Sequence, residues 1–258
     1  MSLIEAVLIM LAGMAAGTIN TIVGSGTLVT FPTLLAMGFP PVAANMSNTV
    51  GLVAGGLSGT WGYRKELGGL KDLLKRLAPW SFAGGVVGAL LLLVLPEEAF
   101  STIVPVLIAT GVLLVLVGPA LQRRAAASRS DSESEGESLG RRVLLAGGVF
   151  AAGVYGGYFG AAQGVLLMGM MSVLLANPLQ QLNGVKNLLS TIVNAVAAAV
   201  FLVVAWDQIE WAVVALIAVG ALIGGVIGAK VGRKLPPWLL RAFIVLVGVV
   251  AIVNLLRG

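Results

Sequence analysis

The sequence contains no cysteine and no histidine. Without cysteine there is no disulfide framework, and cysteine usage gives no indication of the redox compartment. Without histidine, the serine of Gly24-Ser25-Gly26 lacks the usual base that would activate it as a nucleophile. We therefore expect a protein that is not an enzyme, with no catalytic residues, no cofactor and no metal site.

Charged residues are also scarce, at 10% of the 258 residues, whereas hydrophobic residues make up 58% and the mean hydropathy is +1.01. A chain of this composition cannot cover its apolar side chains with a water-compatible surface, so we expect the lipid bilayer as its surroundings. The net charge of +5 does not indicate nucleic acid, because the basic residues lie in short segments between apolar runs. No phosphate-binding loop is present, so energy from ATP would need another chain.

Eight long hydrophobic segments predict an all-α, polytopic integral membrane protein with about 8–10 membrane passes. Six segments have the length of one crossing: 41–63, 80–95, 99–121, 182–206, 211–231 and 238–256. The other two, 3–37 and 141–176, would each be about 50 Å long as a helix, against a hydrocarbon core of about 30 Å. Each has a Gly-rich break near its middle, which predicts two half-crossings or a re-entrant hairpin.

The two long segments begin two halves that match in sequence. Residues recur 138 positions apart in three pairs: Ser25 and Gln163, Gly26 and Gly164, Asn45 and Asn183. Interrupted apolar segments at matching places in two halves are the best sequence indication of a transporter's binding site. We divide the chain into a first transmembrane repeat, 1–121, a flexible polar linker, 122–142, and a second transmembrane repeat, 143–258.

Loop charges predict the orientation of these halves, because cytoplasmic loops collect Lys and Arg. Basic residues predict a cytoplasmic location for loops 64–76 and 230–237 and for the linker, whereas acidic residues mark the loops at Glu97 and Asp207. Matching loops then fall on opposite sides of the membrane, which requires an odd number of passes in each half. The pattern predicts two inverted repeats in the cell membrane, with both termini outside.

Lys186 is the one basic residue placed inside a predicted span. Three asparagines follow the spacing of one helix face beside it: Asn183, Asn187 and Asn194. A lysine with amide neighbours suits an anion, because the ammonium supplies charge and the amides donate hydrogen bonds. The alternative is that Lys186 snorkels to the cytoplasmic interface and serves topology. Snorkelling explains the lysine but not the asparagines.

The breaks provide a second set of donors, because the N-terminus of a helix inside a membrane can hold an anion. We expect Gly24, Gly26, Gly160 and Gly164 to be the hinges of the broken helices. The predicted substrate-binding residues are Lys186, Asn187, Asn183, Asn45, Asn48, Ser25, Gln163, Asn20, Thr21 and Asn194. The alternative for the glycines is close helix packing alone.

The duplicated motifs resemble those of a known family, the sulfite exporter TauE/SafE family of prokaryotic membrane proteins. In the first half they are AGTINTIVGSGTLVTFPTLLAMG and AANMSNTVGL, and in the second YGGYFGAAQGVLLMGMMSVLLANP and QLNGVKNLLSTIVN. The resemblance covers nearly the whole chain. It implies export or exchange of small sulfur-containing anions, such as sulfite or organosulfonates, across the prokaryotic plasma membrane.

These observations predict a secondary transporter for small anions that works by alternating access around a site near the membrane midplane. A passive anion channel, or an accessory membrane subunit without transport activity, is the alternative. The polar residues placed inside the spans speak against a mere scaffold, which would not need them. The sequence leaves homo-oligomerisation open.

Overall fold

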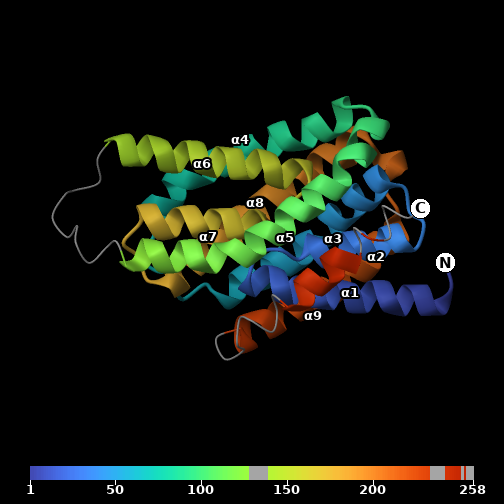
Figure 1. Ribbon diagram of the computed structural model, residues 1–258, viewed down its shortest axis with the longest axis horizontal. Coiled ribbons are helices and arrows are strands. Elements are labelled where there is room, and N and C mark those ends of the chain that lie inside the picture. The colour runs from blue at the N-terminus through green and yellow to red at the C-terminus, as the bar shows by residue number, and fades with distance from the viewer. Residues whose placement is uncertain (128–138, 233–241, 251–252, 254–258) are drawn as a thin grey trace.

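The computed structural model describes residues 1–127, 139–232, 242–250 and 253, and in these ranges the chain is a bundle of helices without strands (Figure 1). The helices are α1 (Leu3–Ile22), α2 (Thr27–Ala36), α3 (Pro41–Gly62), α4 (Lys71–Val94), α5 (Glu97–Ala127), α6 (Leu139–Tyr158), α7 (Gln163–Leu174), α8 (Leu179–Val204), the 3-10 helix η1 (Trp206–Gln208) and α9 (Trp211–Val231). Of the predicted span 238–256, the structure describes residues 242–250 and 253, and these are helical.

Five of the described helices are long and apolar enough to cross a membrane: α1, α4, α5, α8 and α9. Helices α3 and α6 have a comparable length, 22 and 20 residues, but are more polar. In α3 the polar side chains are buried in the bundle, where Asn45, Ser47 and Asn48 have no exposed surface. The polarity of α3 therefore belongs to the interior of the protein and not to a lipid-facing surface.

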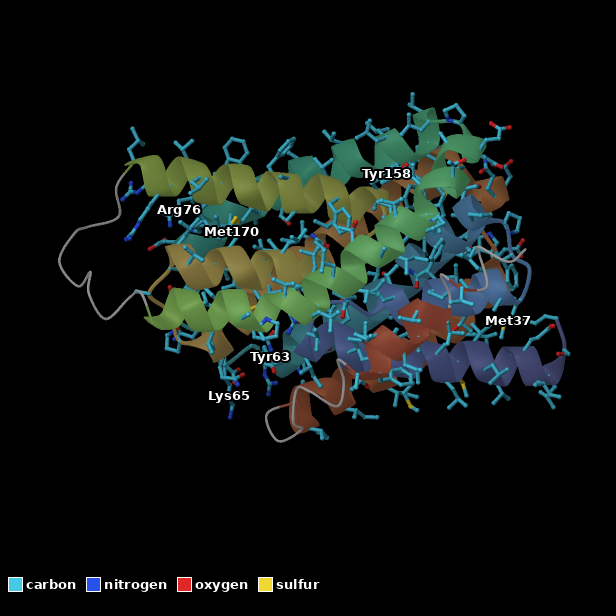
Figure 2. All side chains as sticks on the ribbon, in the orientation of Figure 1. Met37, Tyr63, Lys65, Arg76, Tyr158 and Met170 are labelled. Atoms are coloured by element: carbon cyan, nitrogen blue, oxygen red, sulfur yellow. The ribbon has the colours of Figure 1, made fainter. Side chains whose placement is uncertain are left out.

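Each of the two long segments is divided into two helices by a glycine in the left-handed region, Gly24 with φ +89° and Gly160 with φ +80°. After the break the chain folds back along the helix that it has just left. Gln163 lies against Gly156 and Met170 lies against Gly148, so α7 runs antiparallel to α6. In Figure 2, Met37 at the end of α2 lies near the end of the bundle where α1 starts. Both breaks thus form re-entrant hairpins.

The two halves are interleaved, because α1 packs against α9 and α6 packs against α4. Both contacts are made by glycines whose missing side chains let the helix backbones approach. The contacts correspond in pairs. Between α4 and α6, Gly84 lies against the carbonyl of Phe150 and Gly88 against that of Val154. Between α9 and α1, Gly224 lies against the carbonyl of Met14 and Gly228 against that of Thr18. The same packing thus occurs twice, with the roles of the halves exchanged.

Helices extend into both ends of the predicted linker 122–142. Helix α5 continues through Ala127 and α6 begins at Leu139. The serine- and glutamate-rich part, 128–138, lies outside the described residues. Likewise α4 begins at Lys71, well before the predicted start of its span, because the basic first turns continue the same helix.

Basic residues gather at one end of the bundle. Lys65 and Arg76 lie at this end in Figure 2, and Arg76 and Arg141 line a common pocket between the starts of α4 and α6. The first turn of α5 and η1, which carry acidic residues, lie at the other end, where α4 connects to α5 and α8 to α9.

These two ends predict opposite accessibility for single cysteines introduced into the cysteine-free chain. Asp207→Cys should react with a membrane-impermeant maleimide in intact cells, whereas Lys65→Cys should react only after permeabilisation, because basic loops stay in the cytoplasm. The unmodified chain, which has no thiol, gives the background. Reaction of both variants in intact cells would contradict the topology.

Candidate functional site

The breaks of the two halves touch each other. The amide of Gly164 donates a hydrogen bond to the carbonyl of Gly24, with 3.0 Å between nitrogen and oxygen. A Cβ atom on either glycine would lie within about 2.5 Å of the other's backbone, well inside van der Waals contact. The contact therefore requires glycine at both positions. It brings the segment before α2 against the first turn of α7.

Lys186 has no exposed surface and ends at the last turn of α1. Its ammonium donates hydrogen bonds to the carbonyls of Asn20, at 2.9 Å, and Thr21, at 3.0 Å. The last carbonyls of a helix have no partner within it, and a positive charge there complements the helix dipole. Lys186 therefore caps the interrupted helix α1 and does not snorkel to the interface.

The asparagines beside Lys186 complete this cap. The side-chain amides of Asn187 and Asn183 donate to the carbonyl of Thr21, at 3.1 and 3.4 Å. Thr21 takes part through its carbonyl, because its hydroxyl donates to the carbonyl of Gly17 within α1. The cap on α6 is simpler: Asn45 donates to the carbonyl of Tyr158 at 2.9 Å.

Four of the predicted side chains, those of Ser25, Gln163, Asn45 and Asn183, carry a buried polar atom without a hydrogen bond, and two of these atoms can donate one. These two donors are the hydroxyl of Ser25, in a residue with no exposed surface, and the side-chain nitrogen of Gln163, in a residue 3% exposed. Ser25 lies just before α2, and Gln163 is the first residue of α7. The first turn of each helix also leaves backbone N–H groups without intrahelical partners. Unpaired donors thus lie where the N-termini of α2 and α7 meet, a place that we call the crossing. Such an arrangement of donors binds anions.

The remaining predicted residues are Asn48, which contacts α2, and Asn194, which lies farther along α8. Asn48 accepts a hydrogen bond from the hydroxyl of Thr30 and donates to that of Thr27 at 3.3 Å. Neither threonine was expected in the site; the signal was their spacing, which puts both on one face of α2. Asn194 lies about two turns beyond Lys186 on α8, and no hydrogen bond links it to either break within the described residues.

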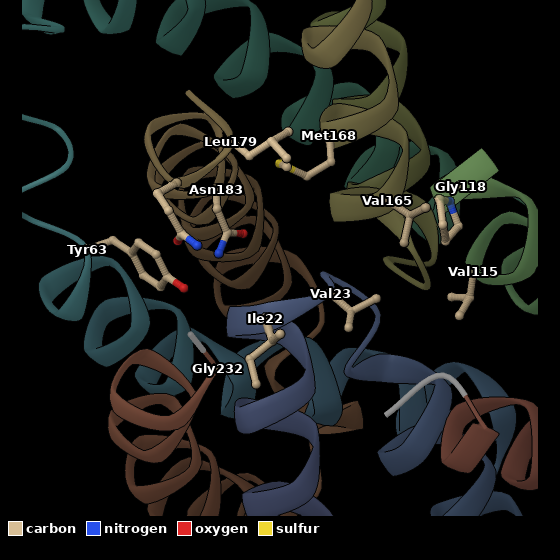
Figure 3. A pocket seen from close by; sticks show the side chains of 12 residues that line it. Ile22, Val23, Tyr63, Val115, Gly118, Val165, Met168, Leu179, Asn183 and Gly232 are labelled. Atoms are coloured by element: carbon tan, nitrogen blue, oxygen red, sulfur yellow. The ribbon is translucent and has the colours of Figure 1, made fainter. Parts of the chain in front are cut away.

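A cavity of about 200 Å³ lies beside the end of α1 and draws its walls from both halves (Figure 3). Tyr63 and Asn183 point toward it in this view, opposite Val165 and Met168. The oxygen of the Asn183 side chain makes no hydrogen bond. Because Tyr63 precedes the basic loop 64–76, the cavity faces the basic end of the bundle.

Aromatic rings fill the opposite side of the crossing. Phe31 of α2 packs edge-to-face on Phe159 at 5.2 Å, and Phe100 of α5 packs on Tyr158 at 5.6 Å between ring centroids. Phe31, Phe100 and Phe159 are fully buried. Since Phe100 follows the acidic first turn of α5, this aromatic cluster lies between the crossing and the acidic end.

Comparison with known proteins gives one consistent result. The family model described as sulfite exporter TauE/SafE matches residues 9–255. A "Probable membrane transporter protein" of Haemophilus influenzae is 29% identical over 91% of this chain and 88% of its own length. "Probable membrane transporter protein YfcA" of Escherichia coli K12 is 28% identical over 94% of this chain and 86% of its own. No solved structure matches the chain significantly.

The contact between the breaks predicts that Gly164 tolerates no side chain. Gly164→Ala should lower the Tm of the purified protein by roughly 5 °C or more, because the new methyl group overlaps the backbone of Gly24. Gly169→Ala, in the same helix but with no atom within 4 Å of the new methyl group, should leave the Tm unchanged or raise it slightly. Equal Tm values for the two variants would contradict the close approach of the breaks.

Proposed function

Because the chain belongs to the sulfite exporter TauE/SafE family, a family of membrane transporters, we propose that it is a secondary transporter for small anions, with sulfite and organosulfonates as its substrates. One observation carries this proposal. Donors without a partner lie at the N-termini of α2 and α7, and the side chain of Lys186, the one lysine buried among the described residues, passes the first turn of α7.

The proposed site holds the anion between the two helix N-termini. Its oxygens accept hydrogen bonds from the backbone N–H groups there, from the hydroxyl of Ser25 and from the amide of Gln163. The Cδ of Lys186 lies 3.0 Å from the Cβ position of Gly164, so this lysine passes the first turn of α7 on its way to α1. Its ammonium has three N–H groups and the α1 carbonyls take two, which leaves one for the anion.

The proposed mechanism is alternating access by two inverted repeats. The exchanged contacts between α1 and α9 and between α6 and α4 support an inverted arrangement. The cavity faces the basic, cytoplasmic end, and the aromatic cluster around Phe31 closes the other path. Rocking of the repeats would open the aromatic side and close the cavity. A channel would instead pass anions without saturation.

Ser25 and Gln163 allow anion binding to be tested without loss of stability. Ser25→Ala and Gln163→Met remove polar atoms that make no hydrogen bond in the fold, so the Tm without substrate should not fall. Addition of sulfite or a sulfonate should raise the Tm of the unmodified protein and raise it clearly less in both variants. The salts are compared at constant sodium gluconate, with sulfate, phosphate and acetate as other anions.

Ser172→Ala is the matched control. Ser172 is also buried and its hydroxyl also makes no hydrogen bond, but it lies near the other end of α7. Its variant should keep the full response to sulfite. A response that Ser25→Ala and Gln163→Met leave intact would contradict the site, and the absence of a response to every anion would contradict the function.

The role of the Lys186 charge is tested with a variant that keeps a hydrogen-bond donor at the end of α1. Lys186→Gln retains an amide for the cap but removes the charge, and it should lower sulfite flux into proteoliposomes by about tenfold or more, as expected when a charge-assisted hydrogen bond of about 1.5–3 kcal/mol is lost. Lys230→Gln, an exposed lysine in the last turn of α9, should transport normally. Normal flux in Lys186→Gln would show that the charge serves the fold alone.

A further inference from the structure

The two caps on the broken helices are reciprocal. Asn183 of α8 donates to the end of α1, and Asn45 of α3 donates to the end of α6. These asparagines are 138 positions apart, as are Asn48 and Lys186. Each half thus caps the interrupted helix of the other half. The end of α1 receives a fixed positive charge from Lys186, whereas the matching position at the end of α6 carries the neutral Asn48.

Oxygen atoms lie near Asn48, at the position that matches Lys186 but carries no positive charge. The side-chain oxygen of Asn45 is buried and makes no hydrogen bond. The oxygens of Asn48, Thr30 and Thr27 belong to one buried network beside it. The hydroxyl oxygen of Thr27 lies 3.5 Å from the point that a Cβ atom would occupy on Gly160, the glycine just after α6. The carbonyl of Tyr158, already held by Asn45, supplies a further oxygen.

We propose that a small monovalent cation of the size of Na⁺ binds among these oxygens and takes, at the end of α6, the place that the Lys186 ammonium has at the end of α1. The inference rests on the proposed function, because such an ion would be the coupling ion of the transporter. Hard cations choose carbonyl and hydroxyl oxygens, and in transporters the C-terminal ends of broken helices hold coupling ions in this way.

The ligands also select the charge of the ion. Every one of them is neutral, and no acidic residue that the structure describes belongs to the network. Divalent ions are usually bound through carboxylates, so a monovalent ion fits better. The hydroxyl of Thr30 can turn its proton away from Asn48, because hydroxyl rotors adapt to their partners. The asparagine is also shorter than a lysine and carries no charge, so the ammonium that Lys186 supplies at the end of α1 has no counterpart here.

Na⁺ alone is the probe for this site. The Tm of the purified protein is measured as sodium gluconate replaces N-methyl-D-glucamine gluconate at constant ionic strength, without any substrate anion. The Tm should rise saturably by about 2 °C or more, since a ligand that binds only the folded state stabilises it. Asn45→Ala and Thr27→Val should remove the response. Thr33→Val is the matched control, because the Thr33 hydroxyl bonds only to the carbonyl of Val29 within α2.

Asn48→Lys gives the complementary result. This substitution places an ammonium at the position that matches Lys186, so the variant should be as stable without Na⁺ as the unmodified protein is with it. Equal Tm values in the two gluconate salts, or a Na⁺ response that persists in Asn45→Ala and Thr27→Val, would overturn the inference. A response to sulfite without one to Na⁺ would overturn this site alone, and the reverse result would overturn the anion site alone.

Discussion

The structure depends on how two helices can end inside an apolar bundle. The last carbonyls of α1 and α6 and the first N–H groups of α2 and α7 are away from water, and each unpaired backbone group there costs free energy. The carbonyls are paired across the halves, by Lys186 on α1 and by Asn45 on α6. This requirement fixes the position of α8 against α1 and of α3 against α6. The hydroxyl of Ser25 and the side-chain nitrogen of Gln163 have no such partner, and we propose that an anion takes them.

The same constraint explains why the halves match in geometry but differ in chemistry. Both halves need a glycine in the left-handed region, a returning helix and a polar third helix that reaches the opposite hairpin. Only one half supplies a fixed charge. The end of α1 thus has a positive charge and the end of α6 a set of neutral oxygens, and we propose that these two places bind two different ligands, an anion and a cation.

The sequence predicts the breaks and the buried polar face, but not their partners. The length of 3–37 and its glycines require an interruption, and the spacing of Asn183, Lys186 and Asn187 requires a common face. The partner of Lys186 is backbone, however, and carbonyls leave no sequence signal. The sequence match of Ser25 with Gln163, 138 positions apart, also differs from the match of the helices. Helices α2 and α7 start at Thr27 and Gln163, which are 136 positions apart, and they end 138 positions apart because α7 is two residues longer than α2.

The proposed anion site, where the N-termini of α2 and α7 meet, can be observed directly. Selenite has the shape and charge of sulfite and scatters anomalously, so diffraction from crystals grown with selenite locates the anion directly. The account predicts an anomalous peak within hydrogen-bonding distance of Ser25, Gln163 and the Lys186 ammonium. A peak at another place, such as the arginines at the basic end, with none at the crossing would contradict it.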